Sequence, residues 1–142
     1  MSLTPLLNAA PAIQLHTVAA MTAIGLGGVQ FAGRKGGARH RLLGWIWVLL
    51  MTGVAASSFF IGTICTWRGF SLIHLLSALT LVALPIAIAH ARAHRVVRHA
   101  RTMRILFFGA LILAGVFTLM PGRIMHDVLF GTLSAHGDCT AP

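Results

Sequence analysis

Charged residues are absent from four long stretches of this 142-residue chain, and that absence limits its fold more than any other feature. The stretches are residues 13–32, 42–64, 71–89 and 105–120, and none contains Asp, Glu, Lys or Arg. A helix needs about 20 apolar residues to cross a bilayer, so each stretch suits a single crossing. The sequence therefore predicts an all-α protein, an integral membrane four-helix bundle.

We expect one transmembrane domain over residues 1–142, because almost nothing remains for a soluble domain. Pro121 and Gly122 are typical of a helix end, so a short interfacial helix and a small polar tail are expected beyond them. The predicted segments are helices at about 13–33, 42–64, 71–94 and 102–120, the interfacial helix at about 122–130, and the tail at 131–142.

The distribution of basic residues predicts the orientation of the bundle. The chain has 11 basic and two acidic residues and a net charge of +9. Residues 34–41 hold four cations and residues 92–104 hold five, whereas the connection between the second and third stretches holds only Arg68. Lys and Arg are enriched in cytoplasmic loops, so both basic loops are expected in the cytoplasm and both termini on the outer, periplasmic side. We expect the protein to be a multi-pass protein of the bacterial inner membrane.

The same basic loops predict partners. Cations at a membrane surface attract anionic lipid head groups, and this accounts for the positive charge without nucleic acid. Anionic lipids are therefore expected at both basic loops, and no nucleic-acid partner is expected.

Eight histidines in a chain with two acidic residues are the main candidates for chemistry. An ionisable residue in a membrane helix suggests a functional site. With the predicted orientation they form two layers. The outer layer holds His16, His74 and His126, and the inner layer holds His40, His90, His94 and His99.

Two layers of histidine favour haem b, because histidines on facing helices can bind the two axial positions of an iron porphyrin. The expected function is electron transfer across the membrane or to and from quinone. The expected ligands are His16 with His74 outside, and His40 with His94 or His99 inside. The remaining cofactor contacts are expected from Arg123 outside, Arg39 or Arg41 inside, and Gln30, which shares a helical face with His16.

Other interpretations remain open. The chain is also typical of a non-catalytic accessory or assembly subunit of a larger respiratory or photosynthetic complex, with no cofactor of its own. A third reading is outer-face copper handling, in which His16, His74 and His126 are the metal ligands. The sequence has neither paired carboxylates nor a phosphate-binding loop after a strand, so no catalytic residue is assigned.

Cys65 and Cys139 are both expected on the outer side. An oxidising periplasm permits a disulfide between them. The sequence leaves both the disulfide and two free thiols open.

Several short motifs resemble those of one bacterial membrane-protein family. They are His16 with Gly27 and Gln30, His40-Arg41 with Gly44 and Trp45, and His99-x-Arg101-x-Met103-Arg104. Over about residues 13–127 the chain resembles the family catalogued as domain of unknown function 2306. The resemblance implies a small multi-helix membrane protein and adds weight to His16, His40 and His99, and it implies no reaction.

Overall fold

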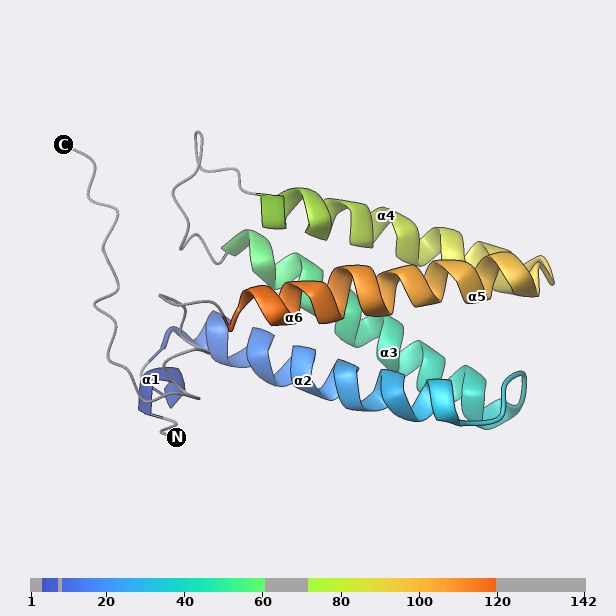
Figure 1. The fold of residues 1–142 in the computed structure, drawn as a ribbon, viewed down its shortest axis with the longest axis horizontal. Coiled ribbons are helices and arrows are strands. Elements are labelled where there is room, and N and C mark those ends of the chain that lie inside the picture. The colour runs from blue at the N-terminus through green and yellow to red at the C-terminus, as the bar shows by residue number, and fades with distance from the viewer. Residues whose placement is uncertain (1–3, 8, 61–71, 120–142) are drawn as a thin grey trace.

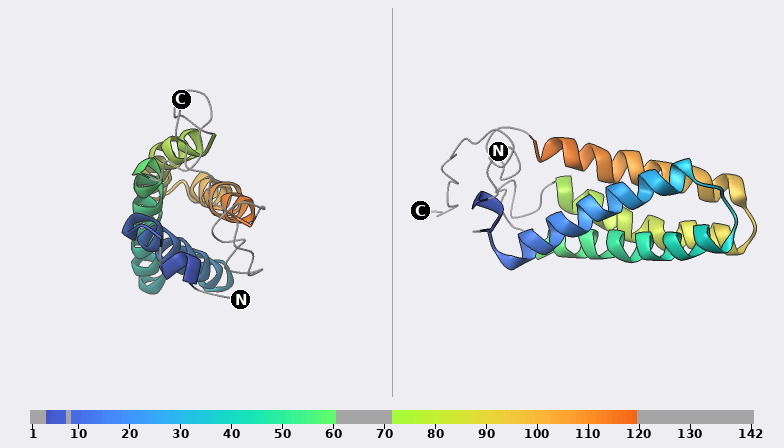
Figure 2. Two further views of the ribbon diagram at one scale, coloured as in Figure 1. Left: turned by 90° about the vertical axis from the view of Figure 1, so that its left-hand side faces the viewer. Right: turned by 90° about the horizontal axis from the view of Figure 1, so that it is seen from below.

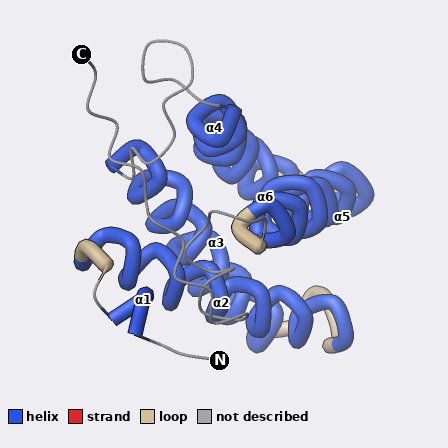
Figure 3. The backbone as a smooth tube through the Cα atoms, turned by 60° about the vertical axis from the view of Figure 1, so that its left-hand side comes forward, coloured by secondary structure: helices blue, strands red, loops and turns tan. Residues whose placement is uncertain are grey.

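The computed structural model describes residues 4–7, 9–60 and 72–119, and every regular element among them is helical (Figure 3). In chain order the elements are α1 (Thr4–Leu7), α2 (Pro11–Ala32), α3 (Ala38–Ser57), the 3-10 turn η1 (Ser58–Phe60), α4 (Leu72–Arg92), α5 (Val96–Arg104), the π-helix η2 (Ile105–Ile112) and α6 (Leu113–Phe117). The last three follow one another without a break and form one rod.

Four helices are long and apolar enough to cross a membrane: Pro11–Ala32, Ala38–Phe60, His74–Arg92 and Val96–Phe117. This confirms the expected all-α fold with four transmembrane helices. The fourth helix begins at Val96, several residues before the predicted start, because the arginine-rich segment 96–104 is itself helical. Arginine is a good helix former, so this segment extends the apolar helix beyond its charge-free stretch. The predicted interfacial helix, the tail, Cys65 and Cys139 lie outside the described residues.

The helices form an antiparallel bundle (Figure 1). Viewed along its length, α2, α3 and α4 follow an arc, and the rod of α5, η2 and α6 packs against both α2 and α4 (Figure 2). The turns at residues 33–37 and 93–95 lie together at one end of the bundle, which we call the basic end (Figure 1). The other end, where α2 begins and α3 ends, is called the opposite end.

The core lies where α2, α3, α4 and η2 meet. Its buried side chains are Ala23, Trp47, Met51, Leu84, Leu106, Phe107 and Leu111. The indole Nε1 of Trp47 donates a buried hydrogen bond of 3.0 Å to the carbonyl oxygen of Ala23, which ties α3 to α2. Most other large apolar side chains are exposed, as expected of residues that face lipid.

The two turns at the basic end use backbone with positive φ. Gly36 has φ of 89° in the first turn, where glycine is the favoured residue, and His94 has φ of 56° in the second. The second turn thus reverses the chain within residues that contain neither glycine nor proline. His94 carries the cost of a side chain in the left-handed region.

Substitution of His94 by glycine is therefore expected to stabilise the protein. The gain should be about 1 kcal/mol or less, because the left-handed strain is removed while glycine adds entropy to the unfolded chain. Thermal unfolding in detergent would measure it. His94→Ala, which keeps a Cβ, should give no such gain, and a lower midpoint for His94→Gly than for wild type would contradict the prediction.

Candidate functional site

His99 has a defined tautomer and lies against a neighbouring helix. Its Nδ1 is 2.9 Å from the carbonyl oxygen of Ala87, so α5 contacts α4 through this hydrogen bond. A carbonyl oxygen only accepts, so Nδ1 carries the proton and donates it. In the neutral ring the lone pair is then on Nε2. A backbone carbonyl that holds one ring nitrogen in this way is the usual support of a ligating histidine.

His90 lies close to this contact. It follows Ala87 by three residues in α4, so the two share one face of the helix. The Nδ1 atom of His90 is buried and has no hydrogen-bond partner among the described residues. A buried polar atom without a partner calls for an explanation, and a bound molecule is one.

His40 is the second such residue. It lies in the first turn of α3, and its buried Nδ1 also has no partner in the described part of the chain. His99 and Lys35 are near enough for their charges to act on it. The main chain at His40 is held from α2, since Gln30 Nε2 donates to its carbonyl oxygen at 3.3 Å. Gly44 leaves room for that amide, because a Cβ there would lie 3.3 Å from Gln30 Nε2.

All four transmembrane helices therefore contribute a polar side chain to the basic end. We call His40, His90 and His99 the histidine cluster. Gln30 supports it from α2. A site built from four separate helices can hold a ligand within a bundle, as cofactor sites in helical bundles do.

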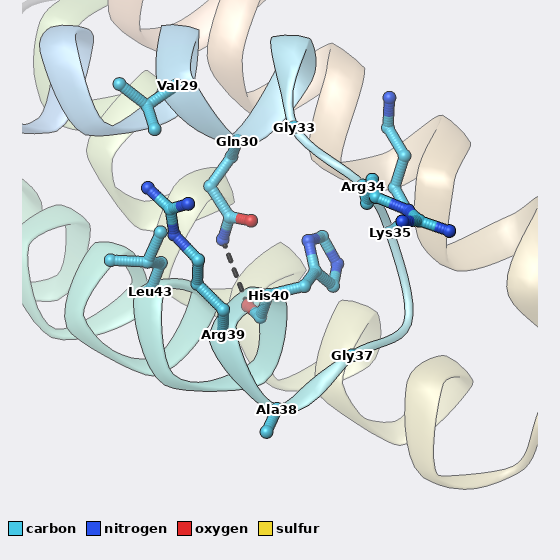
Figure 4. Close-up of a pocket in the computed structure, with 10 residues that line it drawn as sticks. All are labelled: Val29, Gln30, Gly33, Arg34, Lys35, Gly37, Ala38, Arg39, His40 and Leu43. Carbon is cyan, nitrogen blue, oxygen red and sulfur yellow. Dashed lines mark hydrogen bonds between the residues drawn. The ribbon is translucent and has the colours of Figure 1, made fainter.

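A pocket of about 540 Å³ lies beside His40, between the end of α2 and the start of α3 (Figure 4). Ligand pockets commonly have volumes of roughly 300–1,000 Å³. Its lining residues are Val29, Gln30, Gly33, Arg34, Lys35, Gly37, Ala38, Arg39, His40 and Leu43. Three of them carry fixed positive charge. The pocket is therefore suited to an anionic group.

The histidines of the opposite end have separate partners. His16 Nδ1 lies 2.8 Å from the hydroxyl oxygen of Ser57, which in turn donates to the carbonyl oxygen of Val54 at 3.0 Å. Because the Ser57 hydroxyl donates its proton to the carbonyl oxygen of Val54, its oxygen accepts a hydrogen bond from His16. His16 therefore donates through Nδ1 and keeps the lone pair on Nε2. The His74 ring packs against Phe59, with ring centroids 5.6 Å apart.

A metal site with three or more His, Cys, Asp or Glu ligands is not formed within residues 4–7, 9–60 and 72–119. His126 and Arg123, which were expected at the outer site, lie outside the described residues.

The other residues that were expected to bind a cofactor lie at different places in the structure. His40 and His99 both lie at the basic end, in the first turns of α3 and α5, whereas His94 is exposed in the turn between α4 and α5. Arg41 follows His40 and is exposed, and Gln30 binds backbone at the basic end, far along α2 from His16.

The sequence analysis placed His90 in the inner layer but not among the expected haem ligands. Leu84 and Ala87 are buried in α4, and the same three-residue step leads to His90. That helical period was the signal available in the sequence.

Four helices that are long and apolar enough to cross a membrane define a polytopic membrane protein. The family model described as "Predicted membrane protein (DUF2306)" matches residues 13–135, and the chain belongs to this family. No curated protein and no solved structure matches the chain.

Proposed function

We propose that this protein binds haem b at the basic end and takes part in electron transfer at the membrane. The observation that carries the proposal is the histidine cluster. One member has a hydrogen bond that leaves Nε2 with its lone pair, and two members have buried ring nitrogens without partners among the described residues. We assign His99 from α5 and His40 from α3 as the residues that would hold the haem iron, with His90 as a neighbouring hydrogen-bonding group.

The charge at this end supports the assignment. Haem b carries two carboxylates, which are well bound by guanidinium groups. Arg41 is in the same turn of α3 as His40, and we assign it to a propionate. Haem b would supply one-electron transfer at this end of the bundle.

The excess of arginine and lysine at the basic end favours a cytoplasmic position for the site in a bacterial inner membrane. A quinone dissolved in the bilayer would be a suitable electron partner.

The test is the visible spectrum of the purified protein after incubation with hemin, oxidised and then reduced. Wild type should give a sharp reduced α-band and one haem per chain. His99→Asn should lose it, because the amide can still donate to Ala87 but cannot replace the imidazole lone pair. His94→Asn is the matched control, because it changes an exposed histidine only five residues away, and it should keep the band.

Equal spectra for the two variants would contradict the assignment of His99. A wild-type protein that stays colourless would exclude haem binding. If that colourless protein also co-purified with a larger respiratory or photosynthetic complex, the result would favour the accessory-subunit function.

A further inference from the structure

The basic end carries positive charge that the chain cannot neutralise. Eleven basic residues stand against two acidic ones, and both acidic residues, Asp127 and Asp138, lie outside the described residues. No carboxylate therefore lies near the turn at 33–37 within the part of the chain that the structure describes. The described residues leave the cations of this turn open to an anionic group from another molecule.

Three cations of this turn, Arg34, Lys35 and Arg39, are exposed and line the pocket beside His40. Figure 4 shows Arg39 on one side of Gln30 and His40, and Arg34 with Lys35 on the other. Lys35 Nζ donates to the carbonyl oxygen of Phe31 at 2.8 Å, which fixes the lysine at the end of α2. The guanidinium groups of Arg34 and Arg39 remain as the donors best suited to an oxyanion.

The start of α3 adds to the positive potential. It has no side-chain cap, and the Arg41 N–H is bonded to the carbonyl oxygen of Gly37 at 3.1 Å, as the helical pattern requires. The positive end of the α3 dipole therefore faces the turn at residues 33–37, where Arg34 and Lys35 lie.

The pocket also has an apolar side. Val29 and Leu43 line it, and Val29 is half exposed on the bundle surface. The lining thus changes from charged to apolar over the dimensions of one ligand. That combination suits a phosphate group that carries a hydrocarbon chain.

We infer that the pocket between α2 and α3 is a specific phosphate-binding site, with Arg34 and Arg39 as the main ligands. The phosphate can belong to an anionic phospholipid or to a soluble compound, and the chemistry of recognition is the same. The inference does not depend on haem, because no histidine side chain is required.

The experiment is a binding titration of the full chain in a neutral detergent at fixed salt. One probe is short-chain phosphatidylglycerol and the other is inorganic phosphate. Wild type should bind at least one probe saturably, with one site per chain. Arg34→Gln should weaken that binding by about tenfold, which corresponds to about 1.4 kcal/mol.

Arg98→Gln is the control. It lies exposed on α5, removes the same single charge, and is not part of the pocket. General attraction between a cationic protein and an anionic micelle would weaken equally in both variants. A specific site predicts a loss for Arg34→Gln alone, and Arg34→Lys should lie between wild type and Arg34→Gln because the charge remains while the paired donors are lost.

The two probes separate the sources of the phosphate. Tighter binding of the lipid than of inorganic phosphate supports a phospholipid site, and equal binding supports a soluble phosphate compound. Equal weakening by Arg34→Gln and Arg98→Gln would overturn the inference, as would the absence of saturable binding of both probes. Size-exclusion chromatography of each variant shows whether it is folded, and Arg39→Gln offers a second test of the same pocket.

Discussion

Gly27→Ala is expected to destabilise the bundle by about 2 kcal/mol, a typical cost of forcing an extra carbon into a packed core. A Cβ at Gly27 would overlap the ring of Phe107 and lie 3.0 Å from Trp47 Nε1. Neither ring can move aside easily. Phe107 is buried in the core, and Trp47 is held by its hydrogen bond to Ala23. The new methyl group should therefore separate α2 from both α3 and η2.

Gly28→Ala provides the matched control. The residue is next in the same helix, and a Cβ there would have no neighbour within 4 Å. Alanine is a better helix former than glycine by about 1 kcal/mol, so this variant should be neutral or slightly more stable. Unfolding by SDS in mixed micelles, followed by circular dichroism, would give both values. Equal midpoints for the two variants would show that Gly27 is not a close-contact position.

Trp47→Ala is expected to cost about 3 kcal/mol, at the low end of the range for Trp or Phe truncation in a core. The side chain is only 3 % exposed and has both packing contacts and a hydrogen bond to lose. Detergent chains can fill part of the space left, so the lower end of the range is appropriate. The carbonyl oxygen of Ala23 would also lose its indole donor.

Trp45→Ala separates this effect from the loss of any tryptophan in α3. Trp45 is two residues away and 54 % exposed, so it faces detergent or lipid. Its truncation should change the free energy of unfolding by about 0.5 kcal/mol or less, as for most surface substitutions. If Trp45→Ala proved as destabilising as Trp47→Ala, the placement of Trp47 in the core and of Trp45 on the surface would be wrong. Circular dichroism is the appropriate signal here, because tryptophan fluorescence itself changes in both variants.

The transmembrane helices could be predicted from the sequence because charged residues are costly within a bilayer. A stretch without them marks a crossing whatever its neighbours are. The same reasoning fails for the path of the chain between α4 and α5. Residues 90–104 contain neither glycine nor proline, so local preference favours unbroken helix, yet His94 adopts the left-handed conformation that reverses the chain.

The π-helix at Ile105–Ile112 could likewise not be predicted from the sequence. Its residues suit an α-helix equally well, and no local pattern indicates the wider helix that packs against α2 and α4. Packing between helices also separates Gly27 from Gly28, which the sequence presents as equivalent small residues.

Some features of the candidate site could also be predicted from the sequence. Helical spacing and the basic loops placed His40 and His99 in one inner layer, and in the structure both lie at the basic end, in the first turns of α3 and α5. The choice between His94 and His99 depended on where α4 ends. The turn leaves His94 exposed, whereas His99 donates to the carbonyl oxygen of Ala87 and the Nδ1 atom of His90 is buried. At the opposite end, Ser57 and Phe59 contact His16 and His74 separately, and no local pattern indicates these partners.

The two turns of the basic end have a consequence for membrane insertion. Ala32 and Ala38 are six residues apart, so the chain between them reaches about 22 Å at most, and Arg92 and Val96 are joined by about 14 Å. Both reaches are shorter than the roughly 30 Å thickness of the hydrocarbon layer. Neither connection can cross it alone, so α2 and α3 must cross in opposite directions with their turn on one side of the bilayer, and the same holds for α4 and the rod that follows it. Each pair is a hairpin with a single choice of orientation, because the side of the bilayer that holds its basic turn determines the direction of both helices.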